Sequence, residues 1–185
     1  MKWGEVDKHM CSVARVASIV GEPWTLLILR DAFSGIRRFD EFQRSLGVTR
    51  HLLSKRLRKL IDAQILTKIS HSSAPHRREY RLTRRGLALY PVMMTLSQWG
   101  DDWLDHGEGP PIKYTHSRCG KQIQAVLTCG ACGERLRPEE VSSQLSDFLA
   151  NHLDNLKKRR EGTPTIGELT REASIVQKFE NKKSQ

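Results

Sequence analysis

The residues best suited to chemistry lie in one short stretch, HSRCGKQIQAVLTCGAC, which runs from position 116 to 132. One histidine and three of the chain's 4 cysteines form the pattern H-x2-C-x9-C-x2-C: His116, Cys119, Cys129 and Cys132. Zinc is held in tetrahedral sites by Cys and His ligands that come in closely spaced pairs, as they do here. Gly120 and Gly133 follow the two pairs and let the chain turn tightly after the ligand. The pattern therefore predicts a zinc site.

The predicted zinc is structural, because four protein ligands leave no open position for a substrate. Three alternatives remain for the same residues: a redox-active dithiol of Cys129 and Cys132, a disulfide, or no site at all. A dithiol enzyme does not require His116 and Cys119 at a matching spacing, which favours zinc. The chain also lacks a phosphate-binding glycine loop, a nucleophile elbow and paired carboxylates in a pocket frame. We expect a binding protein rather than an enzyme, and the alternative is a zinc-containing thiol oxidoreductase or another zinc enzyme that uses Cys129 and Cys132.

The distribution of charge indicates a second functional region. The net charge is +10, and residues 37–85 carry all of it, with 14 Lys and Arg against 4 Asp and Glu. The other residues balance, with 17 basic (31 less 14) and 17 acidic (21 less 4) side chains. Such a concentration of mostly arginine charge indicates a polyanionic partner, and nucleic acid is the commonest one.

Two predicted helices inside this basic region have the pattern of a helix-turn-helix. The first covers 39–46, Gly47 and Val48 make the turn, and Thr49 caps a second helix, RHLLSKRLRKLIDA. On the second helix Leu53, Leu57, Leu60 and Ile61 form a buried stripe at helical spacing. The lengths and the turn chemistry match a helix-turn-helix, whose second helix enters the major groove of DNA.

A basic hairpin and a long helix follow. Ile65, Thr67 and Ile69 alternate like a strand, as do Tyr80 and Leu82, and the turn SSAP lies between them, which predicts a wing. Residues 84–104 then read as one long helix whose apolar side is too large for a domain of this size to bury. We expect that side, formed by Leu89, Val92, Leu96, Trp99 and Trp103, to be the interface of a homodimer.

These elements predict which side chains meet double-stranded DNA. The exposed face of the second helix should enter the major groove: Thr49, Arg50, His51, Ser54, Lys55 and Arg58. The wing residues should contact phosphates or the minor groove: His76, Arg77 and Arg78. Arg37 and Arg38, before the helix-turn-helix, are expected to hold the DNA backbone, although Arg37 fits a plain surface charge almost as well. A two-fold dimer would suit a palindromic operator.

The same segments carry a family resemblance. Cys11 precedes the first helix, and G-x-x-W-T-L-L-I-L-R, R-R-F-x-E, L-S-x-R-L-R-x-L and E-Y-x-L-T-x-x-G follow in order. Over residues 9–105 the chain resembles the HxlR family of bacterial transcriptional regulators, which are winged helix-turn-helix dimers related to the MarR group. The resemblance implies sequence-specific DNA binding and repression or activation of nearby genes.

Cys11 is a candidate sensor of oxidants or electrophiles. It stands one residue before Ser12, the predicted N-cap of a helix over 12–19, and a helix N-terminus lowers the pKa of a thiol. The resemblance also implies this role, because an equivalent cysteine is redox-active in some members of the family. The alternative is that Cys11 is a small apolar packing residue.

The sequence thus predicts a mainly α protein with a small β-wing, in three parts. These are a winged helix-turn-helix DNA-binding and dimerisation domain (1–107), a zinc-ribbon-like lobe (108–138) and a C-terminal helical tail (139–185), with a helix that begins at Pro138. No internal repeat is evident. No apolar run approaches the ~20 residues of a membrane span, and the N-terminus lacks an apolar signal core, so we expect a cytoplasmic protein with reduced thiols.

Overall fold

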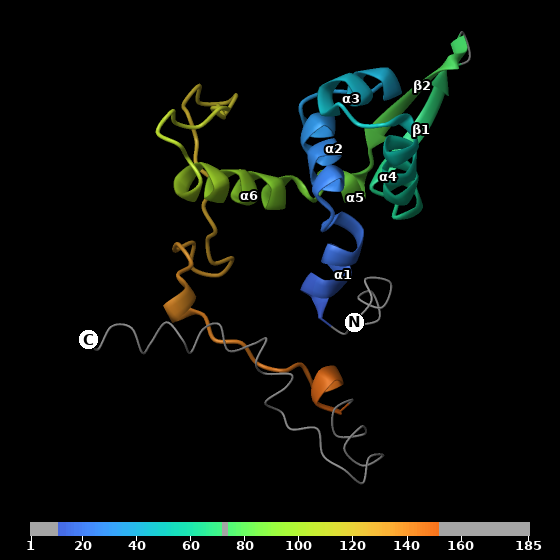
Figure 1. Cartoon of the computed structure of the whole chain (residues 1–185). Helices are drawn as coiled ribbons and strands as arrows, with labels where there is room; N and C mark the ends of the chain where they lie inside the picture. Colours follow the sequence, from blue (N-terminus) through green and yellow to red (C-terminus); the bar gives the residue numbers. More distant parts are fainter. Residues whose placement is uncertain (1–10, 72–73, 152–185) are drawn as a thin grey trace. The chain divides into compact units, whose positions relative to one another are not determined.

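The computed structural model describes residues 11–71 and 74–151. The described elements follow in chain order as α1 (Ser12–Val20), α2 (Pro23–Phe33), α3 (Phe39–Leu46), α4 (Arg50–Asp62), β1 (Leu66–His71), β2 (Ala74–Leu82), α5 (Arg84–Leu87) and α6 (Tyr90–Trp103) (Figure 1). The fold is mostly helical with one two-stranded antiparallel sheet, which confirms the predicted fold class for this part of the chain. The chain divides into two units between Ala125 and Val126.

The core of the first unit lies where α2, α3, α4 and the hairpin meet (Figure 1). The predicted stripe of α4 is its centre, because Leu53, Leu57 and Leu60 are each almost fully buried. Side chains of α2, α3 and β1 complete it: Ile28, Leu29, Phe42 and Leu66. Burial of each such side chain contributes roughly 1.5–3 kcal/mol, so the apolar spacing of α4 fixes which of its faces remains free.

The turn of the helix-turn-helix forms for the local reasons that the sequence indicates. Gly47 ends α3 with φ of +64°, a conformation that costs other residues energy. Thr49 then begins α4, and its hydroxyl oxygen accepts a hydrogen bond from the backbone N–H of Leu52 at 3.3 Å. At the start of α3 the Glu41 carboxylate accepts from the N–H of Arg38 at 3.0 Å.

The hairpin is longer than its alternating residues predict. β1 pairs with β2 in the register Leu66 to Leu82, Lys68 to Tyr80 and Ser70 to Arg78. Residues 37 and 38 lie along the other edge of β2, where Arg38 bridges to Glu79 and the N–H of Tyr80 donates to the carbonyl of Arg37 at 2.8 Å. This extra pairing anchors the base of the wing to the segment that precedes α3.

The single helix predicted over 84–104 is instead two helices, α5 and α6, with a break at Ala88 and Leu89. Pro91 explains the break, because it has no N–H to donate to the carbonyl of Leu87 and its ring crowds that carbonyl. Thr83 caps α5 by accepting from the N–H of Gly86 at 3.0 Å. The apolar residues after the break still share α6, so the predicted interface is shorter than expected.

The described region after α6 contains less helix than the sequence predicts. The boundary expected at 107/108 lies inside the first unit, where the Gln98 side chain of α6 accepts from the N–H of Ala125 at 2.7 Å. The helix predicted from Pro138 does not begin there. Pro138–Glu140 form a single 3-10 turn, residues 141–146 have no regular structure, and helix begins at residue 147 and continues to 151, where the described residues end. Leu153 and Leu156 of the predicted apolar face lie outside the described residues.

The helices differ from membrane spans in length and hydropathy. Within residues 11–71 and 74–151, no single helix is both long and apolar enough to cross a membrane. The helices α1 and α2 meet that criterion only when they are taken together, and they are bent by 80° at their junction.

Candidate nucleic-acid interface

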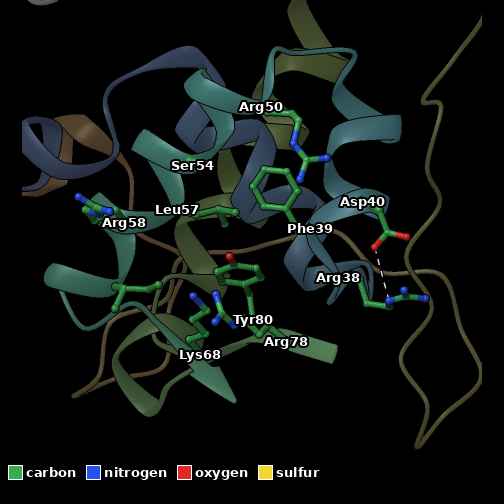
Figure 2. A pocket seen from close by; sticks show the side chains of 11 residues that line it. Arg38, Phe39, Asp40, Arg50, Ser54, Leu57, Arg58, Lys68, Arg78 and Tyr80 are labelled. Carbon is green, nitrogen blue, oxygen red and sulfur yellow. Dashed lines mark ion pairs between the residues drawn. The ribbon is translucent and has the colours of Figure 1, made fainter. Parts of the chain in front are cut away.

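Residues of α3, α4 and the hairpin surround a cavity of about 620 Å³, which we call the basic hollow (Figure 2). Five of its lining residues are cations and one, Asp40, is an anion. The full lining is Arg38, Phe39, Asp40, Arg50, Ser54, Leu57, Arg58, Ile61, Lys68, Arg78 and Tyr80. So many positive charges around one concave surface create a potential that attracts a polyanion.

One stripe of α4 forms a wall of the basic hollow. Arg50, Ser54, Leu57, Arg58 and Ile61 recur at intervals of three and four residues, which places them on one side of a helix. Leu57 belongs to the core, whereas the polar members are exposed. The Arg50 guanidinium lies over the Phe39 ring, 5.0 Å from its centroid, as Figure 2 shows. This cation–π contact holds Arg50 in place at the first turn of α4.

The hairpin supplies the opposite wall through its strand register. Side chains alternate between the faces of a strand, so Leu66 and Lys68 share a face with their partners Leu82 and Tyr80, and Arg78 joins them. This face is apolar at the base of the hairpin and basic nearer its tip. The sequence-based prediction of the DNA-binding residues did not include Lys68. Its position two residues after the buried Leu66 indicates that the two side chains share one face of the strand.

Tyr80 connects the basic hollow to the core. Its ring meets the Phe42 ring edge-on, with centroids 6.4 Å apart and an interplanar angle of 80°. Burial raises the pKa of the Tyr80 hydroxyl above its ordinary value, and the charge of Arg78 opposes that shift. The hydroxyl therefore stays protonated at neutral pH and offers a hydrogen-bond donor at the floor of the hollow.

Other basic residues of α4 lie away from the basic hollow. His51, Lys55 and the capping residue Thr49 are exposed but do not line it, so the structure divides the predicted DNA-reading face into two stripes. Arg56 is turned toward α2, where its guanidinium forms an ion pair with Glu22, and only 14% of its side chain is exposed.

The two arginines before α3 have different surroundings. Arg37 is half-buried, and its guanidinium donates to the backbone carbonyls of Ala32 and of Ile36, the latter at 2.9 Å. It therefore holds the end of α2 to the start of α3, a role that the sequence pattern does not predict. Arg38 lines the basic hollow, with its Nε 3.4 Å from the Asp40 carboxylate. Its side chain is 41% exposed, so the pairing leaves it accessible.

The tip of the wing is described only in part. The backbone of His76 and Arg77 belongs to β2, whereas the side chains of these two predicted contact residues lie outside the described residues. Arg78 is exposed and lines the basic hollow.

The sulfur-containing candidates lie elsewhere in the chain. Cys11 is exposed and is itself the N-cap of α1, one residue earlier than the predicted cap. The predicted cap, Ser12, is already the first helical residue, and its hydroxyl oxygen accepts a hydrogen bond from the Arg15 guanidinium at 3.0 Å. The backbone N–H groups of Cys132 and Ala131 lower the pKa of the Cys129 thiol. Within residues 11–71 and 74–151, no three His, Cys, Asp or Glu side chains are grouped so as to hold a metal ion.

Comparison with known proteins agrees with this geometry. Residues 19–108 match the model of the HxlR-like helix-turn-helix family. A stretch of 133 residues, 72% of this chain, is 46% identical to the uncharacterised HTH-type transcriptional regulator Rv3095 of Mycobacterium tuberculosis, of which it covers 84%. The chain belongs to the HxlR-like helix-turn-helix family. Another relative, the uncharacterised HTH-type transcriptional regulator sll1512 of Synechocystis, is 33% identical over 55% of this chain and 83% of its own length.

Two solved structures similar to this HxlR-like chain are described as transcription factors. PA1607, described as a candidate transcription factor, superposes with a TM-score of 0.70 at 31% identity over 76% of this chain and 98% of its own. PA1374 of Pseudomonas aeruginosa, described in the same way, has a TM-score of 0.55 at 31% identity over 77% of this chain and all of its own, 100%. The HxlR-like chain is thus a member of a family of winged helix-turn-helix transcription regulators.

Proposed function

We propose that this HxlR-like protein is a homodimeric repressor that binds a palindromic operator through α4 and the basic hollow. One observation carries the proposal: cations from two elements far apart in the chain line the same concave surface. Arg50 and Arg58 come from α4, and Lys68 and Arg78 come from the hairpin. Packing a core does not require so many like charges in one place. The phosphates of a DNA backbone that lay between the recognition helix and the wing would neutralise these cations.

The residues of α4 and the residues around it would have different roles on DNA. In the helix-turn-helix geometry the recognition helix lies in the major groove, where His51, Ser54, Lys55 and Arg58 would reach base edges. An arginine there can donate to both O6 and N7 of guanine. Arg38, Lys68 and Arg78 would instead contact phosphates, which position the protein without specifying sequence. Arg50, held by Phe39, belongs with the phosphate contacts because it lines the basic hollow together with Arg38 and the hairpin cations.

Dimerisation is supported by the apolar surface of α6. The side chains of Leu96, Trp99 and Trp103 are 47%, 55% and 74% exposed in the single chain. Contiguous apolar surface of this kind commonly marks a protein–protein interface. A second copy placed by a two-fold axis would cover it and would give two recognition helices for two half-sites.

Regulation by a thiol remains a proposal for Cys11, whose exposure at the start of α1 leaves it open to an oxidant. The relatives and solved structures that match are described as transcription regulators. They give no support to the alternative of a zinc-containing thiol oxidoreductase that uses Cys129 and Cys132.

The proposal is tested by two arginines of β2. Arg78 lines the basic hollow, whereas Arg81 is on the other face of the strand and pairs with Glu79 at 2.9 Å. We expect Arg78→Ala to weaken operator binding by about tenfold and to reduce the slope of log affinity against log salt by about one. Arg81→Ala removes the same charge and should change affinity by less than about twofold.

The operator for this measurement would come from selection of bound duplexes from a random pool, with affinity then followed by fluorescence anisotropy across a range of salt. Lys68→Ala and Lys113→Ala repeat the comparison with a lysine in the basic hollow and an exposed lysine after α6. Equal losses for the members of each pair, or an affinity independent of salt, would show that the basic hollow does not bind DNA.

A further inference from the structure

Arg56 is a basic residue of α4 that is withdrawn from the exposed surface of the helix. It follows Leu53 by three residues and precedes Leu60 by four, which places it on the side of α4 that carries these buried leucines. Only 14% of its side chain is exposed, and it does not line the basic hollow. An arginine in this position is not available to DNA in the way that Arg58 is, so its charge has another role.

The charge of Arg56 is balanced from α2. Its guanidinium forms an ion pair with the carboxylate of Glu22, whose side chain is 39% exposed. Within the described part of the chain, no acceptor reaches the buried Nε of the same guanidinium. This largely buried cation therefore depends on Glu22, because removal of one member of such a pair leaves the other charge without compensation.

Glu22 is fixed at the corner between α1 and α2, two helices that are bent by 80° at their junction. It is the N-cap of α2, and its carbonyl accepts from the N–H of Thr25 at 2.9 Å and from that of Leu26 at 3.2 Å. The residue before it, Gly21, ends α1, and a Cβ there would lie 2.5 Å from the carbonyl oxygen of Ala17. The corner is thus a tight, backbone-bonded anchor for the Glu22 side chain.

The ion pair opposes rotation of α4, which the apolar core opposes only weakly because hydrophobic contacts are not directional. Arg56 is two residues from both Ser54 and Arg58, so it lies on roughly the opposite side of the helix from them. A rotation of about 10° would displace the surface of a helix that is about 10–12 Å across by roughly 1 Å. That displacement is enough to spoil a hydrogen bond to a base edge, whose length varies by only about 0.5 Å.

We propose that Glu22 and Arg56 are positioning residues for operator recognition, because their ion pair fixes the rotation of α4 against the corner of α1 and α2. Neither side chain contacts DNA. The pair acts through Ser54 and Arg58, which meet base edges only at one rotation of the helix. This inference rests on the DNA-binding function proposed above and adds to it the source of its sequence specificity.

The test compares affinity for the selected operator with affinity for an unrelated duplex of equal length, and the ratio of the two measures specificity. We expect Arg56→Gln and Glu22→Gln each to lower this ratio by about tenfold, the discrimination that one base contact supplies. Since neither side chain meets phosphate, the slope of log affinity against log salt should change by less than about 0.3 in both variants. Loss of the Glu22 charge strengthens binding to both duplexes alike, so it does not alter the ratio.

Two double variants separate positioning from stability. Glu22→Gln combined with Arg56→Met leaves no unpaired charge, so it should regain the melting temperature that the single variants lose. Its specificity should stay low, because the ion pair that opposes rotation of α4 is still absent. Glu22→Arg combined with Arg56→Glu reverses the pair and should restore both the melting temperature and the specificity.

Arg81→Gln is the matched control, because Arg81 also pairs with a glutamate, Glu79, but lies on β2. It should keep the wild-type ratio. Circular dichroism at the assay temperature verifies that each variant is folded. If a single variant is not folded, the neutral double variant carries the comparison.

Three results would overturn the proposal. The first is a wild-type ratio in both single variants, and the second is a specificity that recovers together with stability in the neutral double variant. The third is a salt slope reduced by about one in Arg56→Gln, which would show that Arg56 itself contacts phosphate. A wild type that does not prefer its selected operator, or binds it independently of salt, would instead contradict the proposed function, and this inference with it.

Discussion

The side chains of the basic hollow owe their positions to different local causes. Arg50 is held by the Phe39 ring, Arg38 by the carboxylate of Asp40, and Lys68 and Arg78 by the register of the hairpin. Each ion pair or ring contact at this exposure contributes well under about 1 kcal/mol to stability. These contacts fix the side chains without cancelling the repulsion between the cations, which a bound polyanion would relieve.

Cys11 gives a prediction at the same scale. It occupies the N-cap of α1 without a side-chain hydrogen bond to the helix, a position where serine caps better by ~0.5–1 kcal/mol. Cys11→Ser should therefore retain or slightly raise stability while it removes the thiol. If Cys11 is a sensor, mild oxidant should change the operator affinity of wild type by about tenfold and leave that of Cys11→Ser unchanged.

Mass spectrometry of the treated wild type would identify the modified cysteine, and Cys11→Ala serves as the control without a cap. An unmodified Cys11 with unchanged DNA binding ends the sensor hypothesis and favours the packing alternative.

Among the elements, α5 is the shortest helix and is tightly constrained. Thr83 accepts from the N–H of Gly86 and donates its hydroxyl proton to the carbonyl of Gln64 at 2.6 Å. Gly86 itself is buried, and a Cβ there would lie 2.2 Å from the carbonyl oxygen of Ile65. Because that neighbour is backbone at the start of β1, it cannot move aside as a side chain would.

Gly86→Ala should therefore lower the free energy of unfolding by about 2 kcal/mol or more, the cost of overpacking. Gly100 is the matched control, since it also lies in a helix but a Cβ added there would meet nothing within 4 Å. Gly100→Ala should be neutral or stabilising by ~0.5–1 kcal/mol. Urea denaturation at one protein concentration measures both, and an unaffected Gly86→Ala would show that α5 can separate from β1 without penalty.

The elements also show where sequence reasoning succeeds. The spacing of Leu53, Leu57 and Leu60 and the caps at Gly47 and Thr49 predicted α3 and α4 closely, because these signals are local. The apolar stripe of 84–104 predicts one continuous helix and misses the break before Pro91, although the cause of that break is local too. Lys68 and the internal role of Arg37 depend on strand register and on contacts between elements, which spacing along one segment does not reveal.

At the scale of the whole molecule, apolar surface is distributed unevenly. The apolar side chains between α2, α3, α4 and the hairpin are buried. By contrast, Val13 of α1 is 76% exposed, and apolar side chains of α6 such as Trp103 are exposed as well. Charge follows the opposite pattern, since the basic excess lies between residues 37 and 85. The surface expected to meet a second copy and the surface expected to meet DNA are thus chemically distinct, so they can be tested independently.

The dimer prediction uses Leu96, which is 47% exposed on α6, and Ile112, which is 47% exposed after it. A charge at the centre of an apolar interface would be buried without a partner, at a cost that dissociates the copies. Leu96→Glu should therefore convert a dimer into a monomer of unchanged helix content, and Ile112→Glu should stay dimeric. Light scattering coupled to gel filtration gives the mass, and circular dichroism reports the helix content.

The same variants separate dimerisation from DNA recognition. Leu96→Glu leaves every residue of the basic hollow intact, so its affinity for a single half-site should equal that of the wild type. Its affinity for a palindrome with two half-sites about 10 base pairs apart should fall by about 100-fold, because two linked recognition helices bind as one ligand. If the monomer bound the full palindrome as tightly as the dimer does, α6 would have no part in operator recognition, and the exposed tryptophans would need another partner.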